Sequence, residues 1–309
     1  MNQQFQTKVS VMKKDLITVI IPVYNHENYV QLTIRSIIEQ SYNNIELIVI
    51  NDGSNDKSNE MIEAITDECE QRFSKFIHID KKNEGIIKAL NMGIRKAQGK
   101  YLYIIASDDI AEKDALTVLH EFLSSNEDYG LAVGGNTLMD DNGLTCYWDK
   151  NRNNVYTKLE SVYLSFDDYL RKSRSNIDFL SEDFGNYRSI LTGNYIPNGY
   201  LLDKITIDKF GGYSEKAPLE DFYLMLQISK IKKLKFIDKP LFRYRWHANN
   251  SIKNKIRIRK IGHQTLKQEF KYCLRNGHLS LWYHKTYDPI LKYRVGKLKT
   301  IMRRILRTN

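Results

Sequence analysis

The sequence predicts an α/β fold in which helices flank a mostly parallel sheet, followed by a C-terminal helical extension. The first observation is that short apolar runs alternate with helical patterns over the first 135 residues, as in strand–helix–strand units with right-handed crossovers. The second is that polar residues gather where these runs end, which is where open parallel sheets bind ligands. The third is the composition: 42% hydrophobic residues supply a core, and only 5 prolines argue against long linkers.

The predicted strands are runs of aliphatic and aromatic residues, which suit strands buried on both faces of a sheet. They cover residues 17–21, 45–50, 76–79, 101–105 and 131–133. Apolar residues at helical spacing lie between the runs. They predict helices over residues 29–38, 56–70 and 85–97, and a further helix before the last of the strands.

The second half of the chain is less regular at first. Residues 141–195 scatter tyrosine and tryptophan among polar residues, which favours an inserted, partly mobile segment over the sheet. Regular patterns return near Tyr200, with a helix over residues 219–231 and a strand near residues 235–237. From Asn254 the pattern is helical to the end of the sequence, and this is the predicted extension.

Cysteine content and the lack of long apolar runs exclude several classes of protein. The three cysteines are far apart and form no CxxC pair, so neither a disulfide framework nor a zinc site is expected. Residues 1–15 are polar and unlike a signal peptide, and no run approaches the ~20 apolar residues that cross a bilayer. We therefore expect a cytoplasmic protein, either free or held peripherally on the inner face of the cytoplasmic membrane.

The net charge of +10 conceals a strong asymmetry. Residues 230–309 contain 23 lysines and arginines against 3 acidic residues, whereas residues 1–229 carry a net charge of −10. Near the end, apolar residues recur at helical spacing with basic residues between them, a pattern typical of segments on anionic membrane surfaces. The alternative is a helix that packs this stripe on the body, and no nucleic-acid-binding module accompanies the charge. The stripe consists of Leu291, Val295, Leu298, Met302 and Ile305.

Two adjacent carboxylates, Asp108 and Asp109, directly follow the predicted strand over residues 101–105. Hard oxygen ligands of this kind suit Mg²⁺ or Mn²⁺, and such a cation would bind a diphosphate. The alternative is that one of the two carboxylates caps the helix that follows. The pair is therefore a candidate metal site.

Three further positions offer related chemistry. Asp52 follows the predicted strand over residues 45–50, where its carboxylate can accept the N3–H of a pyrimidine or simply form a turn. Glu220 and Asp221 begin a predicted helix, either to supply a general base or to compensate the helix dipole. His247 is a candidate ligand of the metal or phosphate, or an ordinary histidine.

Taken in their order along the chain, these residues resemble the family 2 glycosyltransferases. The resemblance is strong over residues 17–135 and moderate over residues 195–250. It rests on the motifs Ile20-Ile21-Pro22-Val23-Tyr24-Asn25, Asn51-Asp52-Gly53-Ser54, Asn83-x-Gly85 with Asn91-x-Gly93, Ser107-Asp108-Asp109, Glu220-Asp221 and Arg245-x-His247. Two features depart from the family pattern: Asn51 stands in place of a frequent aspartate, and the Asp108-Asp109 pair lacks the commonest acid-x-acid spacing.

The resemblance implies donor-binding and metal-binding roles. The residues that would contact the nucleotide-sugar donor are Pro22, Tyr24, Asn25, Asp52, Lys88 and Asp108. Among the metal ligands, Asp109 would bind the cation directly, and His247 would complete the metal or diphosphate site, whereas Asp108 would face the ribose or sugar.

The resemblance also implies the base and the acceptor side. Asp221 matches the position of the catalytic base of the family, and its neighbour Glu220 would lie on the acceptor side. The stretch Gly193–Gly199 lies near the expected acceptor site and contributes Asn198.

By this resemblance the protein would have the GT-A fold, which is Rossmann-like, and would be an inverting glycosyltransferase that uses Mn²⁺ or Mg²⁺. It would transfer a sugar from a UDP- or dTDP-sugar to a hydroxyl of a lipid-linked glycan, as many relatives do in building bacterial surface polysaccharides such as O-antigen or capsule. Residues 1–135 would bind the nucleotide sugar, residues 136–252 would hold the acceptor and catalytic base, and residues 253–309 would form the basic tail.

Two alternatives stay open at this point. One is a protein that binds sugar nucleotides without transferase activity. The other is a sugar-1-phosphate nucleotidyltransferase, which would normally carry a glycine-rich basic loop where this chain has Pro22–His26.

Overall fold

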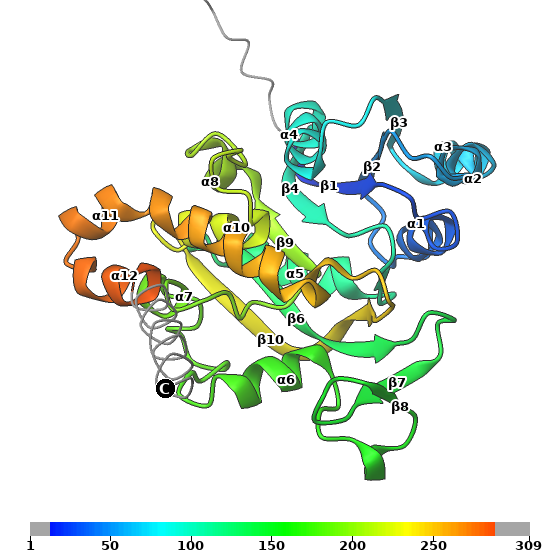
Figure 1. The fold of residues 1–309 in the computed structure, drawn as a ribbon. Coiled ribbons are helices and arrows are strands. Elements are labelled where there is room, and N and C mark those ends of the chain that lie inside the picture. The colour runs from blue at the N-terminus through cyan, green and yellow to red at the C-terminus, as the bar shows by residue number, and fades with distance from the viewer. Residues whose placement is uncertain (1–12, 288–309) are drawn as a thin grey trace, which may run out of the picture.

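The protein is described by a computed structural model that covers residues 13–287, and Figure 1 shows its strands crossing the molecule with helices on both sides. One sheet has the strand order β3-β2-β1-β4-β9-β6-β10-β5. The elements of the first half are β1 (Lys13–Val23), α1 (Val30–Ile38), β2 (Ile45–Asp52), α2 (Ser58–Glu63), α3 (Thr66–Arg72), β3 (Lys75–Lys81), α4 (Ile86–Lys96), β4 (Gly99–Ile104), β5 (Ile110–Ala111), α5 (Ala115–Ser125) and β6 (Tyr129–Met139).

The second half adds a hairpin, two further strands of the sheet and several helices, the last of which form the C-terminal extension. Its elements are β7 (Thr145–Trp148), β8 (Asn154–Val155), η1 (Lys158–Glu160), α6 (Phe166–Ser173), α7 (Tyr187–Ile190), β9 (Tyr200–Asp203), α8 (Lys204–Asp208), α9 (Glu220–Ile228), β10 (Lys233–Arg245), η2 (Ser251–Lys253), α10 (Lys255–Gln268), α11 (Phe270–Arg275) and α12 (Leu279–Thr286).

The N-terminal part of the sheet is parallel, as the alternation of strands and helices predicted. β1 pairs with β2 and β4, and β2 pairs with β3, in each case in parallel. Every residue of β2 is buried, which explains its continuous aliphatic sequence. Because these strands are parallel, the loops after β1, β2 and β4 lie at one edge of the sheet, where ligands bind in folds of this class.

The rest of the sheet is mixed. β9 is antiparallel to both β4 and β6 and joins the two parts of the sheet, while β6 and β10 pair in parallel. β5 begins directly after Asp109 and pairs antiparallel with Phe242 and Arg243 of β10. This pairing brings the turn that contains Asp108 and Asp109 to the end of β10, two residues before His247.

Some predicted elements have different bounds. The helix expected over residues 56–70 is two helices, α2 and α3, because the chain bends at Ile65, whose φ of −121° is not helical. The strands expected over residues 131–133 and 235–237 extend to eleven residues in β6 and thirteen in β10. In β10 buried and more exposed residues alternate, so only a short part of it looks apolar in the sequence.

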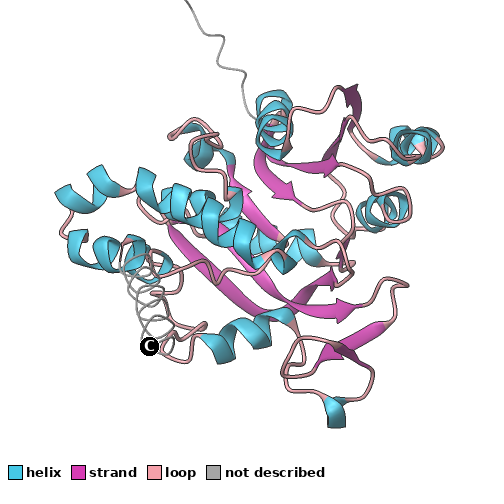
Figure 2. Cartoon of the chain, in the orientation of Figure 1, coloured by secondary structure: helices cyan, strands magenta, loops and turns pink. Residues whose placement is uncertain are grey.

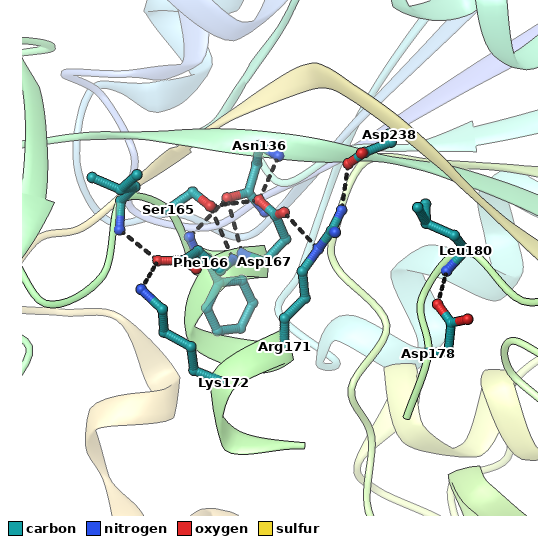
Figure 3. A network of polar contacts seen from close by, with 11 residues as sticks. Asn136, Ser165, Phe166, Asp167, Arg171, Lys172, Asp178, Leu180 and Asp238 are labelled. Carbon is teal, nitrogen blue, oxygen red and sulfur yellow. Dashed lines mark hydrogen bonds and ion pairs between the residues drawn. The ribbon is translucent and has the colours of Figure 1, made fainter. Parts of the chain in front are cut away.

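The segment over residues 141–195, predicted as an insertion over the sheet, contacts the sheet through hydrogen bonds, an ion pair and buried aromatic side chains. Figure 3 shows the start of α6 fixed to β6: Asn136 Oδ1 accepts the first N–H of α6 (2.9 Å), and Asp167 Oδ1 accepts the N–H of Asn136 (3.0 Å). Arg171 of α6 forms an ion pair with Asp238 of β10, with 2.5 Å between Nη2 and Oδ1. Aromatic side chains of the segment are also part of the buried core.

The helices α10, α11 and α12 form the predicted C-terminal extension and lie together at one side of the sheet (Figure 2). Thr265 of α10 accepts the N–H of Leu219 at the start of α9 (3.0 Å), so the extension supports the helix that carries Asp221. The amphipathic stripe predicted over residues 291–305 lies outside the described residues. Within residues 13–287, no helix is long and apolar enough to span a bilayer.

Candidate active site

The loops that follow β1 and β2 hold each other through side chains. Asn25 donates its backbone N–H to Ser54 Oγ (2.9 Å), and Asn25 Oδ1 accepts the N–H of Asn55 (2.8 Å). Asn25 has a left-handed backbone with a φ of 54°, which asparagine tolerates better than most residues. Beside this anchored loop, Pro22 is half-buried and the ring of Tyr24 is 46% exposed. Both are therefore accessible at the edge where a donor base is expected.

Asp52 is buried and anchors the loop between β3 and α4. Its Oδ1 accepts the N–H of Glu84 (3.0 Å), its Oδ2 accepts the N–H of Gly85 (2.8 Å), and Lys81 Nζ donates to the same carboxylate. A carboxylate has about four acceptor positions, so these bonds leave about one for a base N–H. Lys88, on the first turn of α4, forms an ion pair with Glu84 (3.3 Å), which places it beside the same loop.

Asp108 belongs to a cluster of three potential metal ligands. Its Oδ2 lies 2.9 Å from Nε2 of His247, and one ligand atom from each of His26, Asp108 and His247 lies within 4.8 Å of the other two. His26 follows β1 and also bonds Ser107 Oγ through its Nδ1 (2.7 Å). Within residues 13–287, no other group of three histidine, cysteine or acidic side chains comes as close together.

The protonation states in this cluster favour cation binding. Burial alone would raise the pKa of Asp108, but the hydrogen bond from His247 and the charges of both imidazoles lower it. Burial lowers the pKa of His26, and the charge of Asp108 opposes that shift only in part. An ionised carboxylate beside a neutral imidazole is the state in which both groups bind metals.

The carboxylate of Asp109, which the sequence predicted to bind the metal directly, lies outside this cluster. Its Oδ1 accepts the backbone N–H of Arg245 (2.8 Å), and its side chain is fully buried. Burial raises the pKa of Asp109 well above its usual value, and the charge of Asp108 raises it further. The pairing of β5 with β10 causes this orientation, because it turns Asp109 toward the backbone of β10. The carboxylate that faces His247 is therefore Asp108, for which the sequence predicted a contact with the ribose or sugar.

The side chain of Arg245 holds the turn around Asp108 through hydrogen bonds. Its guanidinium is buried and donates to the carbonyl oxygens of Asp108 (2.7 Å), Asp140 (3.1 Å) and Asp141 (3.0 Å). It also stacks over the ring of Tyr29, with 4.8 Å between the guanidinium carbon and the ring centre. Arg245 is thus a positioning residue, because it fixes the backbone that carries Asp108.

The candidate base lies at the start of α9. Asp221 Oδ1 accepts the hydroxyl hydrogen of Tyr200 on β9 (2.8 Å). Burial raises the pKa of Asp221, which makes the carboxylate a stronger base than an exposed aspartate. Burial and the charge of Asp221 together raise the pKa of Glu220 to about 7. Asn198 is half-buried in the loop that leads to β9, two residues before Tyr200, whose hydroxyl bonds Asp221.

The pairing of β9 brings the candidate base close to the end of β4. Leu201 of β9 pairs with Tyr103 of β4, so Tyr200, whose hydroxyl bonds Asp221, lies beside the last residues of β4. The turn that contains Asp108 follows β4 directly. On β10, burial and the charges of Asp109, Asp108 and Asp221 all raise the pKa of Tyr244.

Sequence reasoning missed three residues of this site. His26 gave no separate signal, although it directly follows the motif that ends β1. Tyr200 gave none, because the sequence does not show that its hydroxyl bonds Asp221, which lies 21 residues further along the chain. Tyr244 gave none, because it is one of several aromatic residues of β10 that are buried.

A comparison with protein families decides the identity. Residues 18–184 match the model of "Glycosyl transferase family 2", which covers more than half of the chain. The chain belongs to glycosyl transferase family 2. Membership of this family identifies the protein as a glycosyltransferase. It favours sugar transfer over the two alternatives, a sugar-nucleotide-binding protein without transferase activity and a nucleotidyltransferase.

Curated relatives agree. The glycosyltransferase GlyG of Streptococcus pneumoniae is 25% identical over 236 residues, which cover 75% of this chain and 71% of GlyG. The glycosyltransferase GlyA of the same species is 41% identical over 107 residues, and an uncharacterized glycosyltransferase of Haemophilus influenzae is 44% identical over 115 residues. These two matches span only 15% and 45% of the relatives' own lengths, and 35% and 37% of this chain.

Solved structures confirm the GT-A fold. Residues 1–349 of TarS from Staphylococcus aureus align with a TM-score of 0.51 and 15% identity, covering 84% of this chain and 73% of that one. The mannosyltransferase PcManGT from Pyrobaculum calidifontis, in complex with GDP-Man and Mn²⁺, aligns with a TM-score of 0.58 and 17% identity, covering 88% and 69%. At these identities the likeness shows the shared fold alone.

Proposed function

We propose that this glycosyltransferase moves one sugar, with inversion, from a UDP- or dTDP-sugar to a hydroxyl of a lipid-linked glycan. The observation that carries the proposal is that Tyr200, which bonds Asp221, lies on the strand that pairs with β4, and β4 leads into the turn of Asp108. One carboxylate belongs to the cluster suited to a cation and a diphosphate, and the other is placed to accept a proton. We further propose that residues 1–135 bind the donor and residues 136–252 the acceptor, with residues 253–309 as a basic tail.

The donor would lie along the loops after β1 and β2. Tyr24 offers an exposed ring for stacking, and Asp52 retains about one acceptor position for the N3–H of a pyrimidine. TarS has been solved with UDP-GlcNAc and PcManGT with GDP-Man, which supports a nucleotide sugar as the class of donor. A carboxylate that accepts N–H bonds favours uracil or thymine over cytosine, whose N3 carries no hydrogen.

The donor atoms present fit a divalent cation, which we propose is Mn²⁺ or Mg²⁺. Asp108 and His247 offer a carboxylate oxygen and an imidazole nitrogen 2.9 Å apart, a pair that could bind the same ion. A cation bound there would neutralise the charge that develops on the leaving diphosphate. Arg245 keeps the Asp108 backbone in place while the side chain faces the ligand.

Asp221 would act as the general base. Its carboxylate accepts the proton of the acceptor hydroxyl as that oxygen attacks the anomeric carbon. The bond between this carbon and the diphosphate oxygen breaks at the same time, and the nucleotide diphosphate leaves with the electron pair. The hydrogen bond from Tyr200 fixes one carboxylate oxygen and leaves the other for the proton.

We place the enzyme on the inner face of the cytoplasmic membrane, where a lipid-linked acceptor would be presented. The support is that the C-terminal helices carry basic side chains and also expose large apolar ones, a composition that suits a membrane interface. The exposed apolar residues are Phe270, Leu274, Leu279, Tyr283 and Tyr287.

A panel of nucleotide sugars tests this proposal. With Mn²⁺ present, a UDP- or dTDP-sugar at about 100 times its Kd should stabilise the full chain by about 2.7 kcal/mol, or about 5 °C in Tm. The same donor should be hydrolysed slowly, releasing UDP or dTDP. Stabilisation by purine nucleotide sugars alone would overturn the assignment of the donor, and hydrolysis at an unchanged rate in excess chelator would remove the cation.

A further inference from the structure

The imidazole of His26 stands beside the pair formed by Asp108 and His247. The centres of the two imidazole rings are 6.2 Å apart, and the ring of Tyr29 flanks both, at 5.8 Å from His26 and 5.4 Å from His247. His26 lies in the loop after β1. Its backbone N–H donates a hydrogen bond to Oγ of Ser58 in α2 (2.8 Å), which ties this loop to α2. The ring is thus delivered by an anchored backbone.

The spacing of the three side chains is close to that of a coordination sphere. Their ligand atoms lie within 4.8 Å of one another. An ion with bonds of about 2.1 Å holds neighbouring ligand atoms about 3 Å apart and opposite ones about 4.2 Å apart. The most distant pair of ligand atoms, at up to 4.8 Å, therefore has to come closer by about half an ångström as opposite ligands, or by about 2 Å as neighbouring ones.

We propose that His26 is the third protein ligand of the cation, so that the site binds Mn²⁺ before the nucleotide arrives and prefers it to Mg²⁺. This inference rests on the proposed function for the role of the ion. Two imidazole nitrogens and one carboxylate form a donor set that suits first-row transition ions, whereas Mg²⁺ prefers oxygen ligands and keeps its water. Three ligands from the protein also hold the ion without help from a diphosphate.

The same contacts exist as a closed network without an ion, and the experiment must separate the two cases. In that network His26 simply bonds Ser107, and His247 bonds Asp108. The variant His26→Asn keeps a side chain able to bond Ser107 but removes the imidazole. The matched control is His78→Asn, which replaces a half-buried histidine on β3 away from the cluster.

Calorimetric titration of the full chain with Mn²⁺ and with Mg²⁺, in the absence of nucleotide, measures the affinities. The wild type should bind one Mn²⁺ at least ~10-fold more tightly than Mg²⁺, and His26→Asn should weaken Mn²⁺ binding by ~10-fold or more. His78→Asn should bind like the wild type. Equal Mn²⁺ affinity of His26→Asn and wild type would overturn the proposal. Equal affinity of the wild type for Mn²⁺ and Mg²⁺ would overturn it as well.

Pulsed electron paramagnetic resonance of bound Mn²⁺ gives a second readout that a folding defect does not imitate. Nitrogen modulation should correspond to two imidazoles in the wild type and to one in His26→Asn. A single imidazole in the wild type would sink the proposal whatever the affinities.

These outcomes are distinct from failure of the proposed function. If Mn²⁺ binds through two imidazoles but no UDP- or dTDP-sugar is turned over, the metal site stands and the proposed donor falls. If Mn²⁺-dependent transfer occurs while His26→Asn binds Mn²⁺ normally, the proposed function stands and the role of His26 falls.

Discussion

Replacement of Asp221 by asparagine tests the assignment of the base. Asparagine is nearly the same size, and its Oδ1 can still accept the bond from Tyr200, so the start of α9 should keep its structure. What is lost is the ability to take a proton, and general bases typically contribute 10²–10⁴-fold. At about 1.36 kcal/mol per tenfold, this is about 2.7–5.5 kcal/mol of transition-state stabilisation.

We expect Asp221→Asn to bind the donor normally and to lose ~10²-fold or more in kcat. Donor affinity is measured by Mn²⁺-dependent thermal stabilisation, and kcat by release of the nucleotide diphosphate. Tyr200→Phe is the matched control, because it removes the hydrogen bond but keeps the carboxylate, and it should cost much less. Residual activity of Asp221→Asn within a few-fold of wild type would refute the reasoning, and a loss found instead in Glu220→Gln would transfer the role to Glu220.

The pH profile follows from the same carboxylates. Burial raises the pKa of Asp221, and the charge of Asp221 helps to raise that of Glu220 to about 7. A base must be deprotonated to act, so kcat should rise with pH and level off above the usual titration range of an exposed aspartate. Because the repulsion between the two carboxylates is mutual, Glu220→Gln should move the acid limb to lower pH. An unmoved limb would contradict the coupling.

Three further predictions concern the cluster, its support and the tail. Asp108→Asn should abolish Mn²⁺ binding and sugar transfer, whereas Asp109→Asn should retain Mn²⁺ binding. If calorimetry showed that only Asp109→Asn had lost Mn²⁺ binding, Asp109 and not Asp108 would be the metal ligand. Arg245→Lys keeps the charge but not the fork that donates to three carbonyl oxygens, so urea unfolding should show a loss of about 3 kcal/mol, and a change below about 0.5 kcal/mol would deny its positioning role. Deletion of residues 285–309 should reduce the fraction of protein that floats with anionic liposomes. Equal recovery of the full and the shortened chain would mean that the tail does not bind the membrane.

The parallel part of the fold was predictable because its signals are local. The aliphatic run of β2 and its ending at Asn51 and Asp52 reflect burial on both faces of the sheet. The same holds for α4, whose buried residues Ala89, Leu90, Gly93 and Ile94 recur at helical spacing. The bend at Ile65 and the anchoring of residues 141–195 were not predictable, because they depend on contacts with strands distant in the sequence.

The roles within the site were less predictable than its location. The sequence places Asp108 and Asp109 at the end of a strand, but only the pairing of β5 with β10 decides which of them faces His247. A lone histidine such as His26 has no distinguishing neighbours in the sequence, since Ser107, Asp108 and His247, which lie around its imidazole nitrogens, are 81 or more residues away. Motifs therefore located the open edge, and tertiary pairing assigned the side chains to it.

The most direct measurement is anomalous scattering at the manganese edge from crystals grown with Mn²⁺ and UDP. We expect one strong peak bonded to Asp108 and His247 and to the diphosphate, with the carboxylate of Asp221 facing the site from the acceptor side. A peak on Asp109, or a diphosphate bound away from the ends of β1, β2 and β4, would contradict it.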